Sequence, residues 1–143
     1  MGEKEDREKL IRYQLFENQI KALMERRNFL LTKIMEMDST LDSLEEVEKN
    51  KGKEISLPLG SGIYFPGTLD KTNKMIVEIG ANIAIECTTE KAKEILNKRK
   101  DIVSNGLQRL ENDILNLDNE LSKLEPEIRD MFKKSKSSEL EAG

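Results

Sequence analysis

Few residues of this 143-residue sequence could carry out covalent chemistry. The chain contains no His and a single Cys, Cys87. This composition excludes an ordinary zinc site, a Ser–His–Asp or Cys–His nucleophilic centre and an internal disulfide. A lone Cys with no His to act as its base is more often a small buried apolar residue than a nucleophile. We therefore expect no enzyme activity, no metal and no cofactor.

Gly60-Ser61-Gly62 is the only segment that suggests a phosphate-binding loop. In such a loop the glycines are followed by Lys and Ser or Thr, and a helix opens behind the bound phosphate. Neither feature follows here, so we interpret the segment as a turn.

Charge and hydropathy exclude further classes of function. Charged residues make up 36% of the chain, and the 24 basic and 28 acidic residues give a net charge of −4. A mildly acidic chain with interspersed signs is a poor candidate for nucleic-acid binding. No uncharged apolar run approaches the roughly 20 residues that span a membrane. We expect a cytoplasmic protein, because the single Cys is unpaired and no signal segment is seen.

Glycine and proline divide the chain into parts. The segment 51–88 holds five of the eight Gly and two of the three Pro, whereas residues 1–50 contain only Gly2. Both residue types are unfavourable inside helices. We therefore expect a helix over 1–50, turns and short strands over 51–88, a second helix over 89–134 and a disordered tail over 135–143, all in one structural unit.

Both expected helices carry a long heptad pattern, which predicts a coiled coil. Apolar residues recur at alternating spacings of three and four, with Arg27 and Lys100 as the only polar members. The first seam comprises Tyr13, Phe16, Ile20, Leu23, Arg27, Leu30, Ile34, Met37, Leu41 and Leu44; the second comprises Leu96, Lys100, Val103, Leu107, Leu110, Ile114, Leu117, Leu121, Leu124, Ile128 and Met131.

The matched lengths of the two seams favour an antiparallel hairpin within one chain over a parallel homodimer. Layers whose residue numbers sum to about 140 place Leu44 near Leu96, and both chain termini then lie at one tip. The same register places Arg27 opposite Asp113, either as a buried pair or with the Arg side chain reaching water. Pro126 predicts a kink or a break in the second helix.

The pattern of the segment 51–88 predicts two β-hairpins. Short apolar runs at 55–59, 63–69, 75–79 and 83–87 are separated by turn residues. Thr88 or Thr89 is expected to cap the second helix. Because about 30 residues of hairpin cannot bury both faces alone, the pattern predicts an oligomer.

Two segments carry a resemblance to a known family. Leu-Pro-Leu-Gly at 57–60 and Ile-Gly-Ala-Asn-Ile-Ala-Ile-Glu at 79–86, set between matched helices, resemble the alpha class of prefoldin over residues 5–133. The resemblance implies a mainly α fold, in which a long antiparallel coiled-coil hairpin bears two β-hairpins that assemble into an oligomeric β-barrel body. It also implies an ATP-independent holdase whose tips hold unfolded proteins for a group II chaperonin, with prefoldin beta subunits or further copies as partners, in a hexamer or a filament.

The resemblance points to residues for two roles, client binding and oligomerisation. A filament-forming structural protein and an inert coiled-coil adaptor remain the alternatives, and scattered surface apolar residues are the plain interpretation of the tip. The residues expected to bind unfolded clients are Leu10, Ile11, Tyr13, Leu15, Phe16, Ile128, Met131 and Phe132. Those expected to drive oligomerisation are Ile63, Phe65, Leu69, Val77, Ile79, Ile83 and Ile85.

Overall fold

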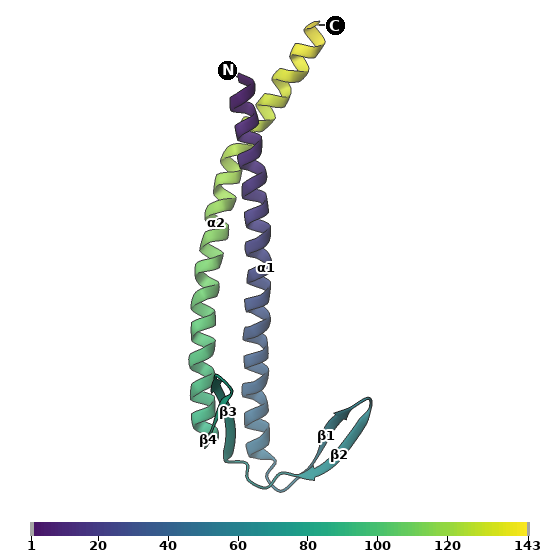
Figure 1. The fold of residues 1–143 in the computed structure, drawn as a ribbon, viewed down its shortest axis with the longest axis vertical. Coiled ribbons are helices and arrows are strands. Elements are labelled where there is room, and N and C mark those ends of the chain that lie inside the picture. The colour runs from purple at the N-terminus through teal and green to yellow at the C-terminus, as the bar shows by residue number, and fades with distance from the viewer. Residues whose placement is uncertain (1, 143) are drawn as a thin grey trace. The chain divides into compact units, whose positions relative to one another are not determined.

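A computed structural model of the chain describes residues 2–142, and describes side chains for residues 2–136. Two long helices flank four strands (Figure 1). The elements are α1 (Gly2–Lys49), β1 (Glu54–Gly60), β2 (Ile63–Thr68), β3 (Lys74–Gly80), β4 (Ile83–Thr88) and α2 (Thr89–Ala142). The expected fold of two long helices with two β-hairpins between them is confirmed.

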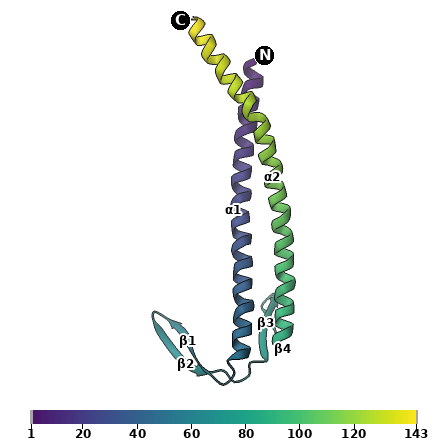
Figure 2. The ribbon, with the colours of Figure 1, turned by 180° about the vertical axis from the view of Figure 1, so that it is seen from behind.

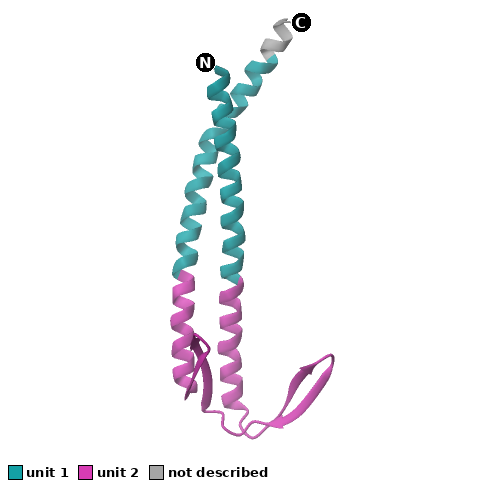
Figure 3. Ribbon diagram, in the orientation of Figure 1, with its two compact units in different colours: residues 1–31, 105–143 teal, residues 32–104 magenta. Residues whose placement is uncertain are grey.

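The chain divides into two compact units (Figure 3). Unit 1 contains residues 1–31 and 105–143, and unit 2 contains residues 32–104. Each unit therefore holds one stretch of α1 and one stretch of α2, and unit 2 also holds all four strands.

Unit 1 is held together by the heptad seams. Its most buried apolar side chains are Ile20, Leu110, Ile114 and Leu124, each at a seam position and at most 9% exposed. The helices run antiparallel, since Lys9 lies 3.8 Å from Glu127 and Tyr13, further along α1, lies near Glu125, which comes earlier in α2. A seam of this kind forms because residues spaced three and four apart share one face of a helix.

Pro126 does not interrupt α2, so the break that the sequence allowed is wrong. Proline removes one backbone hydrogen bond, and the seam on both sides of it supplies the packing that keeps the helix continuous. Glu127, one residue further on, still reaches Lys9 of α1. The second helix was expected to end at residue 134, but α2 extends to Ala142. The segment predicted as a tail, 135–143, lies mostly outside the residues whose side chains are described.

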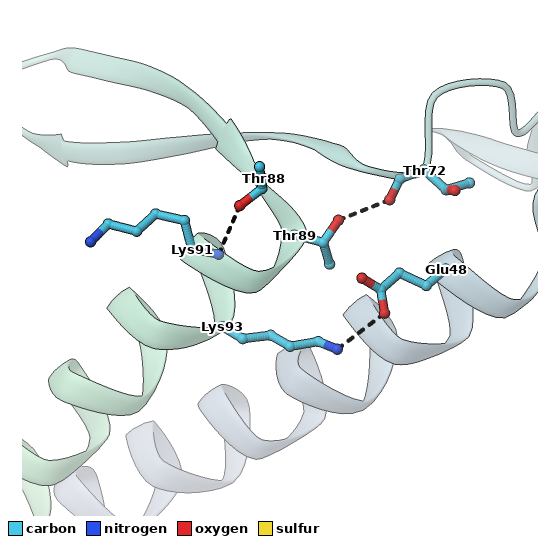
Figure 4. Close-up of polar contacts among 6 residues, drawn as sticks. All are labelled: Glu48, Thr72, Thr88, Thr89, Lys91 and Lys93. Carbon is cyan, nitrogen blue, oxygen red and sulfur yellow. Dashed lines mark hydrogen bonds and ion pairs between the residues drawn. The ribbon is translucent and has the colours of Figure 1, made fainter.

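Polar contacts join the elements of unit 2 at the start of α2 (Figure 4). The Thr88 hydroxyl accepts a 3.1 Å hydrogen bond from the Lys91 amide and so caps the helix, as the sequence predicted. The Thr89 side chain, which is 2% exposed, donates a 2.9 Å bond to the Thr72 carbonyl. These two bonds fix the end of β4 and the loop before β3 to the first turn of α2.

Two ion pairs link the helices within unit 2. Lys93 Nζ lies 3.1 Å from a carboxylate oxygen of Glu48, as Figure 4 shows. Lys100, the polar member of the second seam, pairs with Asp38 of α1. The residue numbers of these pairs sum to 141 and 138, which agrees with the register expected from the heptads.

The two hairpins have the same strand register and turn conformation, and equivalent residues are 20 positions apart in the sequence. Strand β1 pairs antiparallel with β2 from Glu54↔Thr68 to Gly60↔Ile63, and β3 pairs with β4 from Lys74↔Thr88 to Gly80↔Ile83. Each register shifts once, just before the turn. Both turn residues have positive φ in each hairpin: 52° and 79° at Ser61 and Gly62, and 50° and 61° at Ala81 and Asn82. Gly60-Ser61-Gly62 is therefore a tight turn, as interpreted from the sequence.

The two hairpins differ in what supports them. Both views of the ribbon show β3 and β4 beside the first turns of α2, whereas β1 and β2 project away from the helices (Figures 1 and 2). A pocket of about 250 Å³ is lined jointly by β3 and the helices of unit 2, and its lining includes Met75, Val77, Leu44, Ala92 and Leu96. One face of the β3–β4 hairpin is thus partly covered, while most residues of β1 and β2 are exposed.

Candidate functional site

The end of unit 1 that holds both chain termini exposes apolar side chains. We call residues 2–16 and 124–136 the tip. Within it Ile11, Leu15 and Phe132 are 58%, 53% and 59% exposed. The other tip residues singled out from the sequence are half-buried, namely Leu10, Tyr13, Phe16, Ile128 and Met131. The tip therefore exposes apolar side chains among charged ones, and apart from Leu124 its seam residues are less buried than Ile20 and Leu110.

Charged groups of both signs surround the apolar side chains of the tip. Partial desolvation, followed by the nearby carboxylates of Glu17 and Glu125, raises the pKa of the Tyr13 phenol above its ordinary value. Glu125 belongs to α2 and Tyr13 to α1, so their proximity agrees with the register expected from the heptads. A tip of this kind can offer apolar contact surrounded by charged groups of both signs, and it contains no group arranged for covalent chemistry.

The hairpins of unit 2 form a second exposed apolar surface. Of the predicted oligomerisation residues, Ile63, Phe65, Ile79 and Ile83 are between 51% and 61% exposed. Leu69, Val77 and Ile85 are half-buried; Val77 lies directly opposite Ile85 in the β3–β4 register. The structure therefore gathers the seven residues on two hairpins without burying any of them fully.

Further exposed apolar residues lie on the hairpins and were not predicted from the sequence. They are Leu57, Leu59, Tyr64 and Ile76, each at least 48% exposed. These residues could have been found from the sequence, because both faces of a hairpin stay exposed when no other element covers them. Tyr64 and Ile76 alternate with the predicted residues of their strands, whereas Leu57 pairs with the predicted Phe65 from a strand in which no residue was predicted.

Arg27 does not form the buried pair with Asp113 that was one of its two predicted alternatives. Its Nε atom is buried and has no hydrogen-bond partner among the described residues. Asp113 is exposed, and within residues 2–136 it forms no ion pair with Arg27. Arg27 instead lines a shallow pocket with Met24, Ile114 and the exposed acids of α2.

The described residues contain no cluster of His, Cys, Asp or Glu suited to hold a metal ion. Cys87 is a free thiol on β4 and is half-buried. Within the described chain, neither helix has a stretch long and apolar enough to cross a membrane.

Comparison with known proteins identifies the family of the chain that carries these two surfaces. Residues 16–134 match the Prefoldin family, described as prefoldin subunits. The chain belongs to the prefoldin family. Prefoldins are chaperones, and the exposed hairpins and the apolar tip are thus found on a member of a chaperone family.

Individual relatives agree with this assignment to the prefoldins. Prefoldin subunit alpha of Thermofilum pendens is 38% identical over 71 residues, which cover 49% of this chain and 55% of the relative. Prefoldin subunit alpha of Methanosarcina acetivorans is 32% identical over 94 residues, covering 63% of this chain and 66% of the relative. The chain thus spans less than two thirds of these relatives' own length.

A solved structure confirms the prefoldin fold. Filamentous prefoldin from Methanocaldococcus jannaschii, determined by cryo-electron microscopy, superposes with a TM-score of 0.55 at 22% identity. The match covers 85% of this chain and 96% of the other. At this identity the likeness establishes the fold alone.

Proposed function

We propose that this chain is an alpha-class prefoldin subunit that holds unfolded polypeptides at its tip without ATP and releases them to a group II chaperonin. The observation that carries the proposal is the exposure of Ile11, Leu15 and Phe132 at the open end of an otherwise well-packed seam. Apolar groups at a helix end can bind the apolar surface of a partner. A loosely packed end can also adapt to irregular clients.

Oligomerisation through the hairpins supports the same proposal. A single tip offers few contacts, so useful affinity requires several tips on one body. The exposed hairpin residues provide the surface on which copies of this chain, or beta subunits, would build a β-barrel body in the cytoplasm. Strand pairing would then bury the apolar residues that the single chain leaves in water.

The test compares three tip substitutions with matched changes elsewhere. We expect Ile11→Ser, Leu15→Ser and Phe132→Ser together to abolish the delay in aggregation that the assembled protein gives to a denatured client. The control carries Met35→Ser and Ile102→Ser, which remove apolar side chains 70% and 71% exposed in unit 2. This control should hold the client as well as the unchanged protein, in the absence of ATP.

Two outcomes would contradict this proposal. Full holding activity in the tip variant would move client binding to another surface. An intact assembly without any holding activity would favour the second candidate, a self-assembling filament protein. That candidate is supported by the filamentous state of the Methanocaldococcus jannaschii prefoldin. Electron microscopy of the chain alone, with and without a beta-class subunit, distinguishes a closed complex from a filament.

A further inference from the structure

One face of α2 within unit 1 carries a regular series of exposed residues beside the seam. Its members directly follow the seam residues from Leu110 to Met131, so they recur at spacings of four and three and share one side of the helix. Residue 136 continues this spacing, and every member from 111 to 136 is exposed. We call these eight residues the lateral stripe, which is about 37 Å long at a rise of about 1.5 Å per residue.

The first half of the lateral stripe is acidic around an exposed leucine. It consists of Glu111, Leu115, Asp118 and Ser122. Leu115 is 58% exposed, and a shallow pocket of about 280 Å³ beside it has Met24 and Ile114 in its lining together with the two acids. Within residues 2–136 neither acid forms an ion pair. This half therefore presents an apolar contact between two exposed carboxylates, with Arg27 as the one cation in the pocket lining.

The second half of the lateral stripe has the opposite character. It consists of Glu125, Arg129, Phe132 and Lys136. Phe132 is 59% exposed and stands between the two cations, three residues after the first and four before the second. Glu125 is the acid of this half, and its carboxylate lies 3.1 Å from the Arg129 guanidinium. This half therefore presents an aromatic ring between two cations.

The two halves complement each other when one of them is read in the reverse direction. The spacings of the stripe are the same from either end, so in an antiparallel pair of helices all residues whose numbers sum to 247 face each other at once. The resulting pairs are Glu111–Lys136, Leu115–Phe132, Asp118–Arg129 and Ser122–Glu125. Two acids then meet two cations, the apolar residues meet each other, and the Ser hydroxyl can donate to the Glu carboxylate.

We propose that two copies of this chain pair side by side and antiparallel through the lateral stripe. The partner is a second copy because the stripe is complementary to itself, in the antiparallel direction only. Parallel pairing would set Glu111 against Glu111 and Lys136 against Lys136, which is unfavourable. The antiparallel contact is two-fold, so it forms each pair of residues twice and closes on itself. Phe132 of each copy enters the pocket beside Leu115 of the other.

This contact is separate from the assembly proposed for the hairpins. It uses residues of unit 1 alone, whereas all four strands belong to unit 2. Exposed ion pairs are individually weak and are screened by salt, so the pairing depends on ionic strength. Because Phe132 also belongs to the tip, a paired copy covers part of the surface that we assign to clients.

Cross-linking tests the register. Leu115→Cys and Phe132→Cys are made in separate full-length chains, each with Cys87→Ser, and the two chains are mixed with a short bis-maleimide. We expect a cross-link between them, because facing residues of helices packed about 8–10 Å apart lie within its reach. Leu115→Cys alone should not link, since the two copies of residue 115 lie 17 positions apart along the stripe, or about 26 Å. Linking of Leu115→Cys to itself, or no linking in the mixture, would overturn the proposal.

Charge reversal tests the recognition between the two halves. Glu111→Lys with Asp118→Lys, introduced into both cross-linking chains, should lower the yield of the cross-link about tenfold or more at about 50 mM salt. Arg129→Glu with Lys136→Glu should do the same, because either change leaves a stripe of one sign. Chains that carry all four reversals should link as well as chains that carry none.

Asp113→Lys with Glu120→Lys is the matched control. These acids directly precede seam residues and so lie on the other side of the seam, and the control changes the net charge by the same amount as Glu111→Lys with Asp118→Lys. The control should leave the yield of the cross-link unchanged. An equal loss in the control, or no recovery in the chains with four reversals, would overturn the proposal. Client holding is measured separately, so a failed pairing and a failed holdase give different results.

Discussion

Replacing Arg27 by Leu is expected to stabilise the coiled coil. Arg27 occupies a seam position, and its Nε atom is buried with no hydrogen-bond partner among the described residues. A buried donor without a partner costs about 1–3 kcal/mol. Leucine fills the seam and removes this cost. Glu111 and Asp118 line the same pocket but are exposed, so losing their attraction to the Arg charge costs only a few tenths of a kcal/mol.

The expected gain is therefore about 1–2 kcal/mol in the free energy of unfolding. Unfolding entropy of about 2.1 cal/mol/K per residue gives about 0.3 kcal/mol/K for this chain, so the Tm should rise by about 3–7 °C. Thermal unfolding followed by circular dichroism, at one fixed protein concentration, measures this shift.

Lys100→Leu is the matched control, because Lys100 is the other polar seam residue and it has a partner in Asp38. Removing a paired cation leaves Asp38 without its ion pair, so this variant should gain less than Arg27→Leu. Asp113→Ala should change the Tm little, since Asp113 is exposed and surface changes usually fall within about 0.5 kcal/mol. A lower Tm for Arg27→Leu, or a marked loss for Asp113→Ala, would refute the reasoning and restore a buried Arg27–Asp113 pair.

Three further predictions concern unit 2. Ala81 has a φ of 50°, a conformation that costs an L-residue about 1 kcal/mol. Ala81→Gly removes this cost and should slow hydrogen exchange of the β3–β4 amides. Ala84→Gly, in extended backbone, should speed the same exchange. Thr88→Ala removes the helix cap and should lower the free energy of unfolding by about 1 kcal/mol in denaturant titration, an effect that Thr88→Ser should largely restore. Thr89→Val removes the hydroxyl that donates to the Thr72 carbonyl, at a residue that is only 2% exposed. This variant should lower the free energy of unfolding by about 1–3 kcal/mol in the same titration. An unchanged free energy of unfolding would mean that water replaces the hydroxyl.

The helices and their seams could be predicted because burial in a coiled coil repeats along the sequence. Ile20, Leu110, Ile114 and Leu124 are buried at the positions that the heptads indicate. The hairpins were also predictable, since Gly60 and Gly80 introduce turns between short apolar runs. In each case the determinant is local, so residue type and spacing carry enough information.

Contacts between distant elements could not be predicted in the same way. The bond from Arg99 to the Glu78 carbonyl joins a side chain to a backbone group, and a backbone acceptor leaves no mark in the sequence. The partner of Lys100 was within reach of the register, but many acids on α1 offered the same charge. Pro126 was expected to disturb α2 because its cost is local, whereas the packing that offsets this cost comes from α1.

The two hairpins show that strands with the same backbone geometry can differ at their edges. Their registers and turns agree position by position, yet prolines in the first hairpin stand where the second has glutamates. Proline has no amide hydrogen to donate, so Pro58 and Pro66 reduce the number of hydrogen bonds that a further strand could form there. The exposed apolar side chains of β1 and β2 remain available for packing against other subunits. Substituting Leu57 and Phe65 by Ser should therefore weaken the proposed assembly in sedimentation equilibrium, and an unchanged association would move the contact to another surface.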